Sequence, residues 1–378
     1  MATDNNNKVL NVPNLRFPGF GGEWEREKLR DKCSFYSGGT PSSSNKSYYI
    51  GEIPFIRSGE ISGDSTELFL SEFGLNNSSA KMVDIGDLLL ALYGATSGQI
   101  AISKIRGAIN QAILCIKSSY DNIFLKSVWE KHVDKTLQAY LQGGQGNLSA
   151  DIVKNLSFYF PSLDEQNKIS KLIVLIDERI ETQNKIIEDL KKLKVAIRDK
   201  QLNTIRKHYG LNYQICDLLD YEQPTKYVVT DTEYSEDRSK TPVLTANKAF
   251  ILGYTDESFG VYDKGACIIL DDFTLDCKYV DFPFKVKSSA IKILTVKNGC
   301  SLRYVYEYLN YMNLETTEHK RHYISEIEPM IIAYPTDKKG IDDFNNIMSS
   351  FESKIEIENK YLQSLLTQKV YLLSNMFI

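Results

Sequence analysis

The sequence predicts an α+β protein in which two β-rich modules are joined by two long helices that form an antiparallel coiled coil, with an internal pseudo-twofold repeat. When the chain is shifted by 175 positions, Ile176–Lys185 falls on Phe351–Lys360. In each half, an alternating apolar strand ends at a proline, Pro161 or Pro335, and a long segment with an apolar stripe follows. Internal repetition of this kind defines the architecture before any local pattern does.

The first module is expected over residues 1–160. It contains short β-branched and aromatic runs separated by glycines, a pattern typical of strands and turns. Its loops carry small and polar side chains beside glycines, which let a backbone approach a ligand closely. Arg, Asn, Gln, Ser and Thr are residue types that contact base edges and phosphates, so these loops are candidates for DNA binding, although they can also be ordinary turns. The candidate residues are Thr40, Arg57, Tyr93, Thr96, Gln111 and Gln145.

A long helix is expected over residues 161–210. Acidic residues follow Pro161, where a helix dipole favours them, and no Gly or Pro interrupts the segment before Gly210. About 45 residues at about 1.5 Å each give a rod of roughly 65–70 Å, which no single small domain needs. Its seam, and that of the second helix over residues 335–378, is expected to consist of Ile169, Ile176, Ile180, Leu190, Phe351, Ile355 and Leu365.

Two polar positions recur in both seams, Gln183 with Glu358 and Lys194 with Lys369. Polar seam residues cost stability but can fix the register of a coiled coil. For an antiparallel pair we expect Gln183 to lie opposite Lys369, and Lys194 opposite Glu358. The alternative is that each helix packs only on its own module.

The second module is expected over residues 211–334. It has a similar order of parts with little sequence identity, so the scaffold repeats while the loops differ. Two modules with similar scaffolds but different polar loops are what a ligand with two different half-sites would require, one half-site for each module. The candidate DNA-binding residues here are Lys226, Thr245, Lys248, Thr274, Lys320 and Arg321.

Several functions are disfavoured by the sequence. The P-loop motif, the Asn-Pro-Pro-aromatic loop of adenine methyltransferases and a GxGxxG turn are all absent. Asp271 and Asp272 suggest a metal nuclease, but no Glu-x-Lys partner follows them. The six cysteines lack CxxC spacing, and His319 with His322 are too few for zinc. We therefore expect no catalytic residue, no metal site and no cofactor in this chain.

Composition and charge place further bounds on the chain. With 42% hydrophobic and 25% charged residues it has the composition of a soluble globular protein. With no signal peptide, the six cysteines are expected to be reduced thiols in a cytoplasmic protein. No apolar run approaches the roughly 20 residues of a membrane span, so we expect no membrane partner. The net charge of −4 suggests weak DNA binding by the chain alone, with basic surface supplied by partners.

Motifs along nearly the whole chain resemble the specificity subunit of type I restriction–modification systems. In the first half they are Val12–Phe17 before Glu23-Trp24, Gly39–Ser42, Ile53–Arg57, Gly86–Leu89 with Tyr93-Gly94, Asn110–Ile113, Gly146–Ser149 and Pro161–Gln166. In the second half they are Asp220–Tyr227 and Thr241–Thr245. Residues 335–340 depart from the pattern, because they lack the Glu-Gln that follows Pro161.

The resemblance implies two target-recognition domains, 1–160 and 211–334, that each read one half of a bipartite sequence in double-stranded DNA. It implies that the helices 161–210 and 335–378 carry two methyltransferase subunits, with motor–nuclease restriction subunits outside them. S-adenosylmethionine and ATP with Mg²⁺ would belong to those partners. The alternative function is a non-catalytic coiled-coil scaffold with two protein-binding modules.

Overall fold

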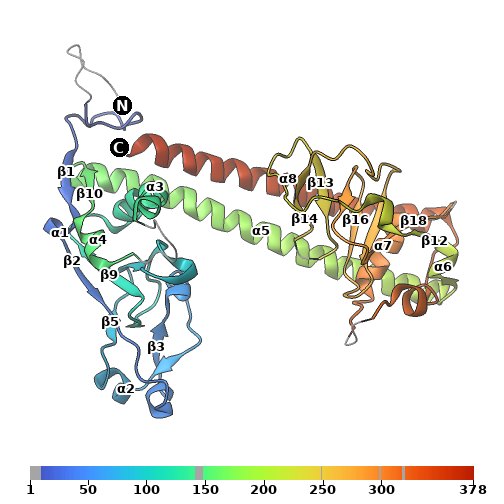
Figure 1. Ribbon diagram of the computed structural model, residues 1–378, viewed down its shortest axis with the longest axis horizontal. Coiled ribbons are helices and arrows are strands. Elements are labelled where there is room, and N and C mark those ends of the chain that lie inside the picture. The colour runs from blue at the N-terminus through green and yellow to red at the C-terminus, as the bar shows by residue number, and fades with distance from the viewer. Residues whose placement is uncertain (1–9, 141–147, 248, 298, 317–319) are drawn as a thin grey trace. The chain divides into compact units, whose positions relative to one another are not determined.

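The computed structural model describes residues 10–140, 148–247, 249–297, 299–316 and 320–378. The chain divides into two compact units (Figure 1). The first comprises residues 1–184 and 360–378, and the second comprises residues 185–359. Each unit therefore contains one β-rich module and a segment of both long helices.

The first unit contains an antiparallel sheet in the order β2-β9-β6-β7. The central strand β6 is fully buried and β9 is buried over Ile113–Ile116, and the helix α3 (Asn122–Tyr140) packs beside β7 through Trp129 and Val133. The strands are β2 (Cys33–Ser37), β9 (Ile113–Ser118), β6 (Leu88–Ala91) and β7 (Ile100–Ile102).

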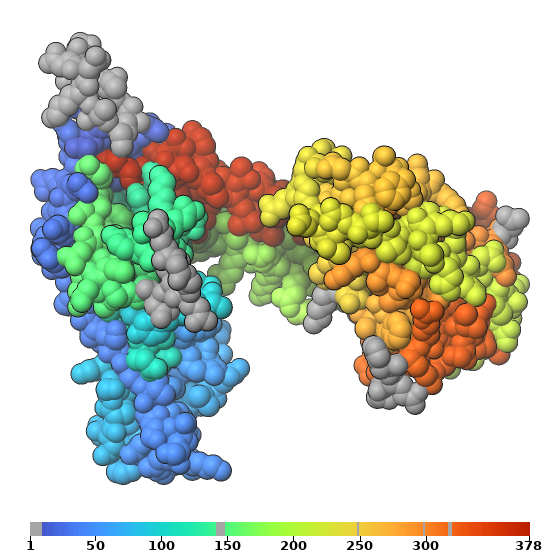
Figure 2. Space-filling view, in the orientation of Figure 1, coloured from blue at the N-terminus to red at the C-terminus, as the bar shows by residue number. Residues whose placement is uncertain are grey.

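A second sheet of this unit has the order β4-β3-β8-β5 and contains a parallel pair, β3 with β8. This sheet lies away from the helix pair of the unit, and Figure 2 shows the same segments, blue to cyan, at the unit's far end. The strands are β4 (Phe69–Leu70), β3 (Ile53–Ile56), β8 (Gly107–Ile109) and β5 (Lys81–Val83). The ribbon β1 (Glu25–Lys28) with β10 (Ser157–Phe160) and the short helices α1 (Leu29–Lys32), α2 (Glu72–Asn76) and α4 (Ala150–Asn155) complete the module.

The second unit repeats this strand order. Its antiparallel sheet runs β12-β18-β15-β16, its other sheet runs β14-β13-β17, and β13 and β17 form a parallel pair. The strands are β12 (Leu219–Glu222), β18 (Ile291–Val296), β15 (Cys267–Asp271), β16 (Cys277–Val280), β14 (Ile251–Thr255), β13 (Thr241–Leu244) and β17 (Lys285–Val286). The ribbon β11 (Tyr213–Gln214) with β19 (Ile331–Ile332), the helix α6 (Ile215–Leu218) and the helix α7 (Leu302–Tyr311) correspond to β1–β10, α1 and α3.

The long helices are α5 (Leu163–Tyr209) and α8 (Lys338–Met376). In the first unit, Ile169 and Ile173 near the start of α5 share a core with Leu372 and Met376 near the end of α8. In the second unit, Leu202 near the end of α5 shares a core with Phe344 and Met348 near the start of α8. The two helices are therefore antiparallel, and the α+β prediction with a coiled coil is confirmed. Of the expected seam, Ile169, Ile176 and Leu365 are buried, whereas Ile180, Leu190, Phe351 and Ile355 are partly buried.

The two helices begin with different contacts. In α5, Glu165 is buried and accepts two hydrogen bonds of 2.7 Å from the Arg16 guanidinium, and Gln166 accepts one from the Asp121 amide at 3.1 Å. In α8, the equivalent position is Gly340, whose amide donates to the Asp337 carboxylate at 2.7 Å. The Glu-Gln after Pro161 therefore anchors the first unit internally, in addition to complementing the helix dipole.

The expected register of the helix pair was wrong. Lys369 pairs with Asp177 at 2.8 Å, and Lys194 pairs with Glu352 at 2.9 Å. Each partner lies six residues before the one expected from the sequence. The physical reason is that each lysine also binds a carboxylate of a third helix, Glu130 of α3 for Lys369 and Glu307 of α7 for Lys194. The expectation considered only the two long helices.

Candidate nucleic-acid interface

The parallel strand pair of the first unit brings two polar loops to one edge. Ile56 at the end of β3 pairs with Ile109 at the end of β8, and the Asn110 amide donates to the Ile56 carbonyl at 3.2 Å. Arg57 and Gln111, which follow these strands, therefore leave the sheet at the same edge. The carboxyl ends of parallel strands are a usual place for ligand sites, because loops from distant parts of the sequence meet there.

Three predicted residues form a hydrogen-bonded cluster at this edge. The Thr40 hydroxyl donates to the Gln111 side-chain carbonyl, and the Tyr93 hydroxyl donates to the Gln111 backbone carbonyl at 2.9 Å. Thr40 and Gln111 are exposed, and Tyr93 is half-buried. The sequence spreads these residues over 71 positions, and the sheet brings them together. The cluster leaves the Gln111 amide group at the surface, where it could contact a base edge.

Arg57 is held by carboxylates of its own module. Its guanidinium binds Glu60 at 3.0 Å and Glu67 at 2.5 Å, and the Arg57 side chain is 39% exposed. These hydrogen bonds raise the pKa of Arg57, and they leave its positive charge locally neutralised. To contact DNA, the Arg57 guanidinium would have to release Glu67, which is the more exposed of its two partners. Base reading by Arg57 stays a prediction.

The other two candidates of the first unit are placed differently. Thr96 ends the short turn Gly94–Thr96 between β6 and β7, and its backbone carbonyl accepts the Gln99 amide at 2.9 Å. This turn follows Tyr93 directly in the chain and connects two strands of the other sheet. Gln145 lies outside the described residues.

In the second unit, the equivalent edge is formed by β13 and β17. Leu244 pairs with Val286, and the Lys287 amide donates to the Leu244 carbonyl at 3.0 Å, as Asn110 does to Ile56. The predicted Thr245 follows β13 as Arg57 follows β3. Exposed Lys287, which the sequence analysis missed, stands in the place of Asn110. Its equivalence to Asn110 becomes visible only in the fold, where both residues follow the second strand of a parallel pair.

The other candidates of this unit lie in two places. Lys226 is exposed in the turn Pro224–Tyr227, 3.9 Å from Glu222. Thr274 is exposed in the β15–β16 hairpin, where its amide donates to the Asp271 carboxylate at 3.0 Å. Lys248 lies outside the described residues.

Lys320 and Arg321 are exposed and belong to a loop that the same hairpin anchors. The buried Asp272 carboxylate accepts the amides of His322 at 3.1 Å and Tyr323 at 2.7 Å, and it lies 3.3 Å from the buried Lys292 ammonium. Asp271 and Asp272 therefore organise the loops that carry Thr274, Lys320 and Arg321. Within the part of the chain that the structure describes, no cluster of His, Cys, Asp or Glu could hold a metal ion.

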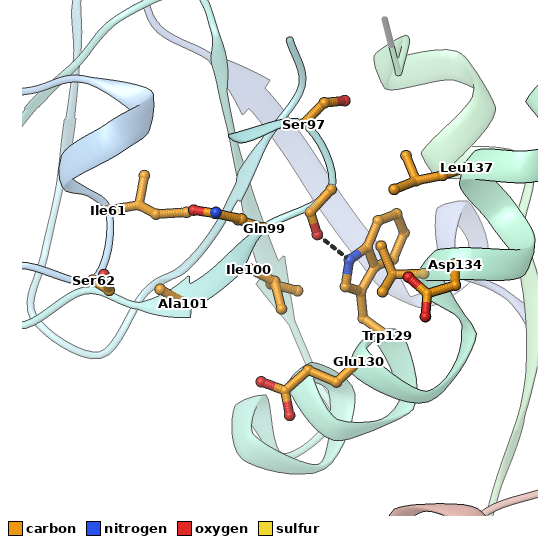
Figure 3. A pocket seen from close by; sticks show the side chains of 12 residues that line it. Ile61, Ser62, Ser97, Gln99, Ile100, Ala101, Trp129, Glu130, Asp134 and Leu137 are labelled. Atoms are coloured by element: carbon orange, nitrogen blue, oxygen red, sulfur yellow. Dashed lines mark hydrogen bonds between the residues drawn. The ribbon is translucent and has the colours of Figure 1, made fainter. Parts of the chain in front are cut away.

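A pocket of about 400 Å³ lies in the first unit between α3 and the β7 segment (Figure 3). Trp129 forms one wall and donates from its indole nitrogen to the Gly98 carbonyl at 2.7 Å. Glu130 and Asp134 line the pocket, so its charge opposes a phosphate group. The acidic lining of this pocket therefore distinguishes it from the polar edge formed by β3 and β8.

A side chain at position 98 is expected to destabilise the fold. The φ of Gly98 is +86°, and an added Cβ would lie 2.8 Å from a Val133 methyl group. We expect Gly98→Ala to lower the free energy of unfolding by about 1–3 kcal/mol, from left-handed strain and overpacking. Urea unfolding would measure the loss, with Gly59→Ala as the control because an added Cβ meets nothing there. Equal stability of the two variants would contradict this packing role.

Comparisons with known proteins agree with this fold. Residues 21–192 match the model of the type I restriction modification DNA specificity domain. Residues 21–192 therefore belong to this family of domains. It is 48% identical over 125 residues to the Escherichia coli type I restriction enzyme EcoR124I/EcoR124II specificity subunit, covering 32% of this chain and 31% of that relative. It is 24% identical over 298 residues to the Methanocaldococcus jannaschii MjaIX specificity subunit, covering 74% of this chain and 67% of the relative.

Solved structures of the family have the same fold. The S subunit of a type I system from M. genitalium matches with a TM-score of 0.58 at 14% identity, covering 97% of this chain and 99% of that one. A chain from a structural study of type I system assembly matches with a TM-score of 0.57 at 13% identity, covering 96% and 99%. Specificity subunits of these systems are non-catalytic. Among the described residues, no helix combines the length and apolarity needed to cross a membrane.

Proposed function

We propose that the chain is the DNA sequence-specificity subunit of a type I restriction–modification complex and binds a bipartite target in double-stranded DNA. Residues 1–160 and 211–334 serve as target-recognition domains, each for one half-site, and residues 161–210 and 335–378 serve as the helical spacers. The protein acts in the cytoplasm. The family match of residues 21–192 and the repeated fold support this assignment.

The observation that carries the proposal is the repeated parallel strand edge with different polar residues. In one unit this edge presents Arg57 and Gln111, and in the other it presents Thr245 and Lys287. The parallel strand pairing is the same, but the hydrogen-bonding groups differ. Because each base pair displays its own donors and acceptors in the major groove, different side chains on one frame would select different half-sites.

Exposed apolar residues on the long helices support docking of partner subunits. On α5, Leu175, Ile186 and Leu193 are exposed, and they share a face because their spacings are close to whole helical turns. On α8, Ile357 and Tyr361 are exposed, and Tyr361 is the repeat equivalent of Ile186. Equivalent apolar positions on both helices suit two copies of one partner, which we propose are the methyltransferase subunits. Restriction subunits, S-adenosylmethionine and ATP with Mg²⁺ belong to the assembled complex.

We expect Ile186→Glu and Tyr361→Glu each to weaken one of two methyltransferase sites. A charge at the centre of an apolar contact should cost at least about 2 kcal/mol, or about 30-fold in affinity. Mass spectrometry of the intact complex should then show one methyltransferase subunit per chain instead of two. Glu188→Gln, at an exposed residue of the same helix paired with Lys192, is the control. Retention of two subunits in both variants would exclude this docking surface.

The function is tested by co-expressing the chain with its neighbouring methyltransferase subunit in a host without DNA methylation. Long-read sequencing should reveal methylation at a two-part motif with a fixed gap. Binding should also weaken steeply with added salt, because phosphate contacts release counterions. A stable complex that leaves the DNA unmodified would contradict the proposal and favour the protein-binding scaffold.

A further inference from the structure

A cluster of alternating charges ties three helical segments together in the first unit. Lys369 on α8 lies 2.8 Å from Asp177 on α5 and 3.5 Å from Glu130 on α3. Lys126, one turn before Glu130 on α3, lies 2.6 Å from Glu130 and 3.9 Å from Asp177. Two ammonium groups and two carboxylates thus alternate across the junction of the module helix with both long helices.

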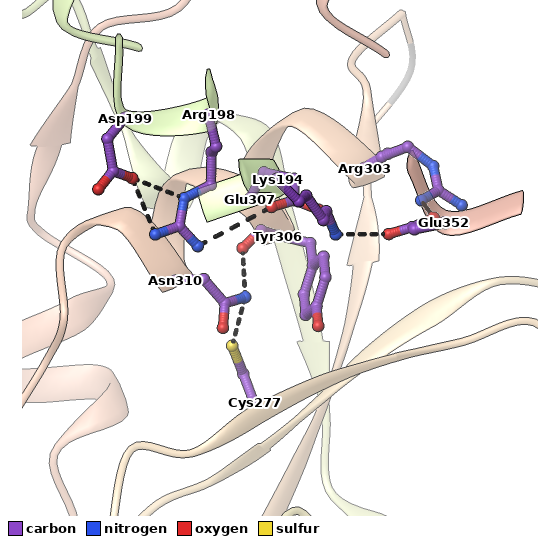
Figure 4. A network of polar contacts seen from close by, with 9 residues as sticks. All are labelled: Lys194, Arg198, Asp199, Cys277, Arg303, Tyr306, Glu307, Asn310 and Glu352. Carbon is purple, nitrogen blue, oxygen red and sulfur yellow. Dashed lines mark hydrogen bonds and ion pairs between the residues drawn. The ribbon is translucent and has the colours of Figure 1, made fainter. Parts of the chain in front are cut away.

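The second unit contains a cluster of the same design (Figure 4). Lys194 on α5 lies 2.9 Å from Glu352 on α8 and 2.6 Å from Glu307 on α7. Arg303, one turn before Glu307, pairs with Glu352. The figure shows Lys194 between the two glutamates, with Arg198 approaching Glu307 from the side.

The two clusters are repeat equivalents. The 175-residue shift that relates the long helices places Lys194 on Lys369 and Asp177 on Glu352. Lys126 and Glu130 have the same spacing on α3 as Arg303 and Glu307 on α7. The charges are kept although the residue types differ at two of the positions. We refer to each four-residue group as an ionic clasp.

Each clasp is partly removed from solvent, which makes its geometry costly to change. The side chains of Lys369 and Lys194 are 20% and 18% exposed, and that of Glu307 is 2% exposed. Burial opposes the charge of Lys369, but its hydrogen bond to Asp177 and the charge of Glu130 raise its pKa above the ordinary value. An apolar cluster would give similar or greater stability, whereas charges at fixed positions specify one register.

We propose that Lys369 and Lys194 are positioning residues that hold the module helix of each unit at one place along the helix pair. Each lysine contacts carboxylates on two other helical segments, so a slide of any segment separates opposite charges. The clasp thereby sets where the reading loops of a module stand relative to its helices. This inference rests on the proposed function, for which such placement would fix the gap between half-sites.

The test uses Lys369→Met in the full chain, in complex with the methyltransferase subunit. Hydrogen exchange of α3 amides should accelerate about tenfold, while exchange of α7 stays unchanged, because local opening needs only local contacts to be lost. Lys194→Met should instead accelerate the exchange of α7 amides and leave α3 unchanged. Methylated sites should then include gaps one base pair longer or shorter than the wild-type gap, and Lys369→Arg should restore the single gap.

Matched controls exist on both helices. Lys354 on α8 pairs with Glu358, and Lys192 on α5 pairs with Glu188, each within its own helix, so Lys354→Met and Lys192→Met should change neither readout. A folded Lys369→Met complex that keeps one gap length, or unchanged α3 exchange, would overturn the proposal. If the wild-type complex methylates no DNA, the proposed function fails separately, and the exchange comparison alone decides whether the lysine holds α3.

Discussion

Replacement of Lys285 by alanine is expected to lower the free energy of unfolding of the second unit by about 3–5 kcal/mol, the usual cost of breaking a buried ion pair. The Lys285 side chain is 0% exposed, and its ammonium lies 2.7 Å from Glu257 and donates to the Phe259 carbonyl at 2.8 Å. It also lies 4.4 Å from the centre of the Phe259 ring. Alanine would leave the Glu257 carboxylate without its counter-ion and a cavity in the core.

Lys264→Ala is the matched control for this prediction. Lys264 forms an ion pair of the same length, 2.7 Å, with Glu222, but its side chain is 55% exposed. Exposed pairs contribute little, because water already solvates both charges. Urea unfolding should therefore separate the two variants clearly. Similar stabilities of the two variants would mean that burial of Lys285 does not determine how much its ion pair stabilises the fold.

The same pair predicts how stability changes with acid. Burial opposes the charge of Glu257, but hydrogen bonds from Lys285 and Thr230 lower its pKa from 4.5 to about 2. A carboxyl whose folded pKa is depressed contributes its full stability above the unfolded pKa and loses it as the pH falls through the folded value. The second unit should thus lose stability between about pH 4.5 and pH 2. Lys285→Ala should flatten this dependence, measured by urea unfolding across that range.

Asp272→Ala is expected to have a comparable effect, about 3–5 kcal/mol, because it leaves buried Lys292 without its counter-ion. It also removes the acceptor of the His322 and Tyr323 amides, which anchors the loop that carries Lys320 and Arg321. Under the proposed function, methylation mapping should show relaxed or lost recognition of one half-site, with the other half-site intact. Calorimetry would measure the stability.

Asp276→Ala is the control within the same hairpin. The Asp276 side chain is exposed and accepts one hydrogen bond of 3.2 Å from the Thr274 hydroxyl. Its removal should leave stability nearly unchanged. If Asp272→Ala unfolds at the same temperature as Asp276→Ala, Asp272 is not the anchor of the loop.

Much of the architecture could be predicted because its signals are local or repeated. Prolines, apolar periodicity and the 175-residue shift predict where α5 and α8 begin and that the frame repeats. The apolar periodicity is present in the sequence because each helix must bury one apolar stripe, whichever surface it packs against. The role of Glu165 was only partly predicted, since a first-turn acid favours a helix start, but its partner Arg16 lies 149 positions away.

The candidate interface could be predicted only as a set of separate loops. The sequence singles out Arg57 and Gln111, but their common edge depends on the parallel pairing of β3 with β8. Lys287 was missed because an isolated exposed lysine carries no local signal. Asp272 was considered as part of a metal site, whereas in the fold its carboxylate accepts two backbone amides and pairs with Lys292.

The sequence by itself determined the helices, the β-rich modules and their repetition, since short-range patterning specifies which residues must be buried. The tertiary structure decided the register of the helix pair and the partners of its charges. Lys369 binds Asp177 and Glu130 because three helical segments meet there, and the energy of such a cluster depends on all three at once. No periodicity within a single segment contains that information.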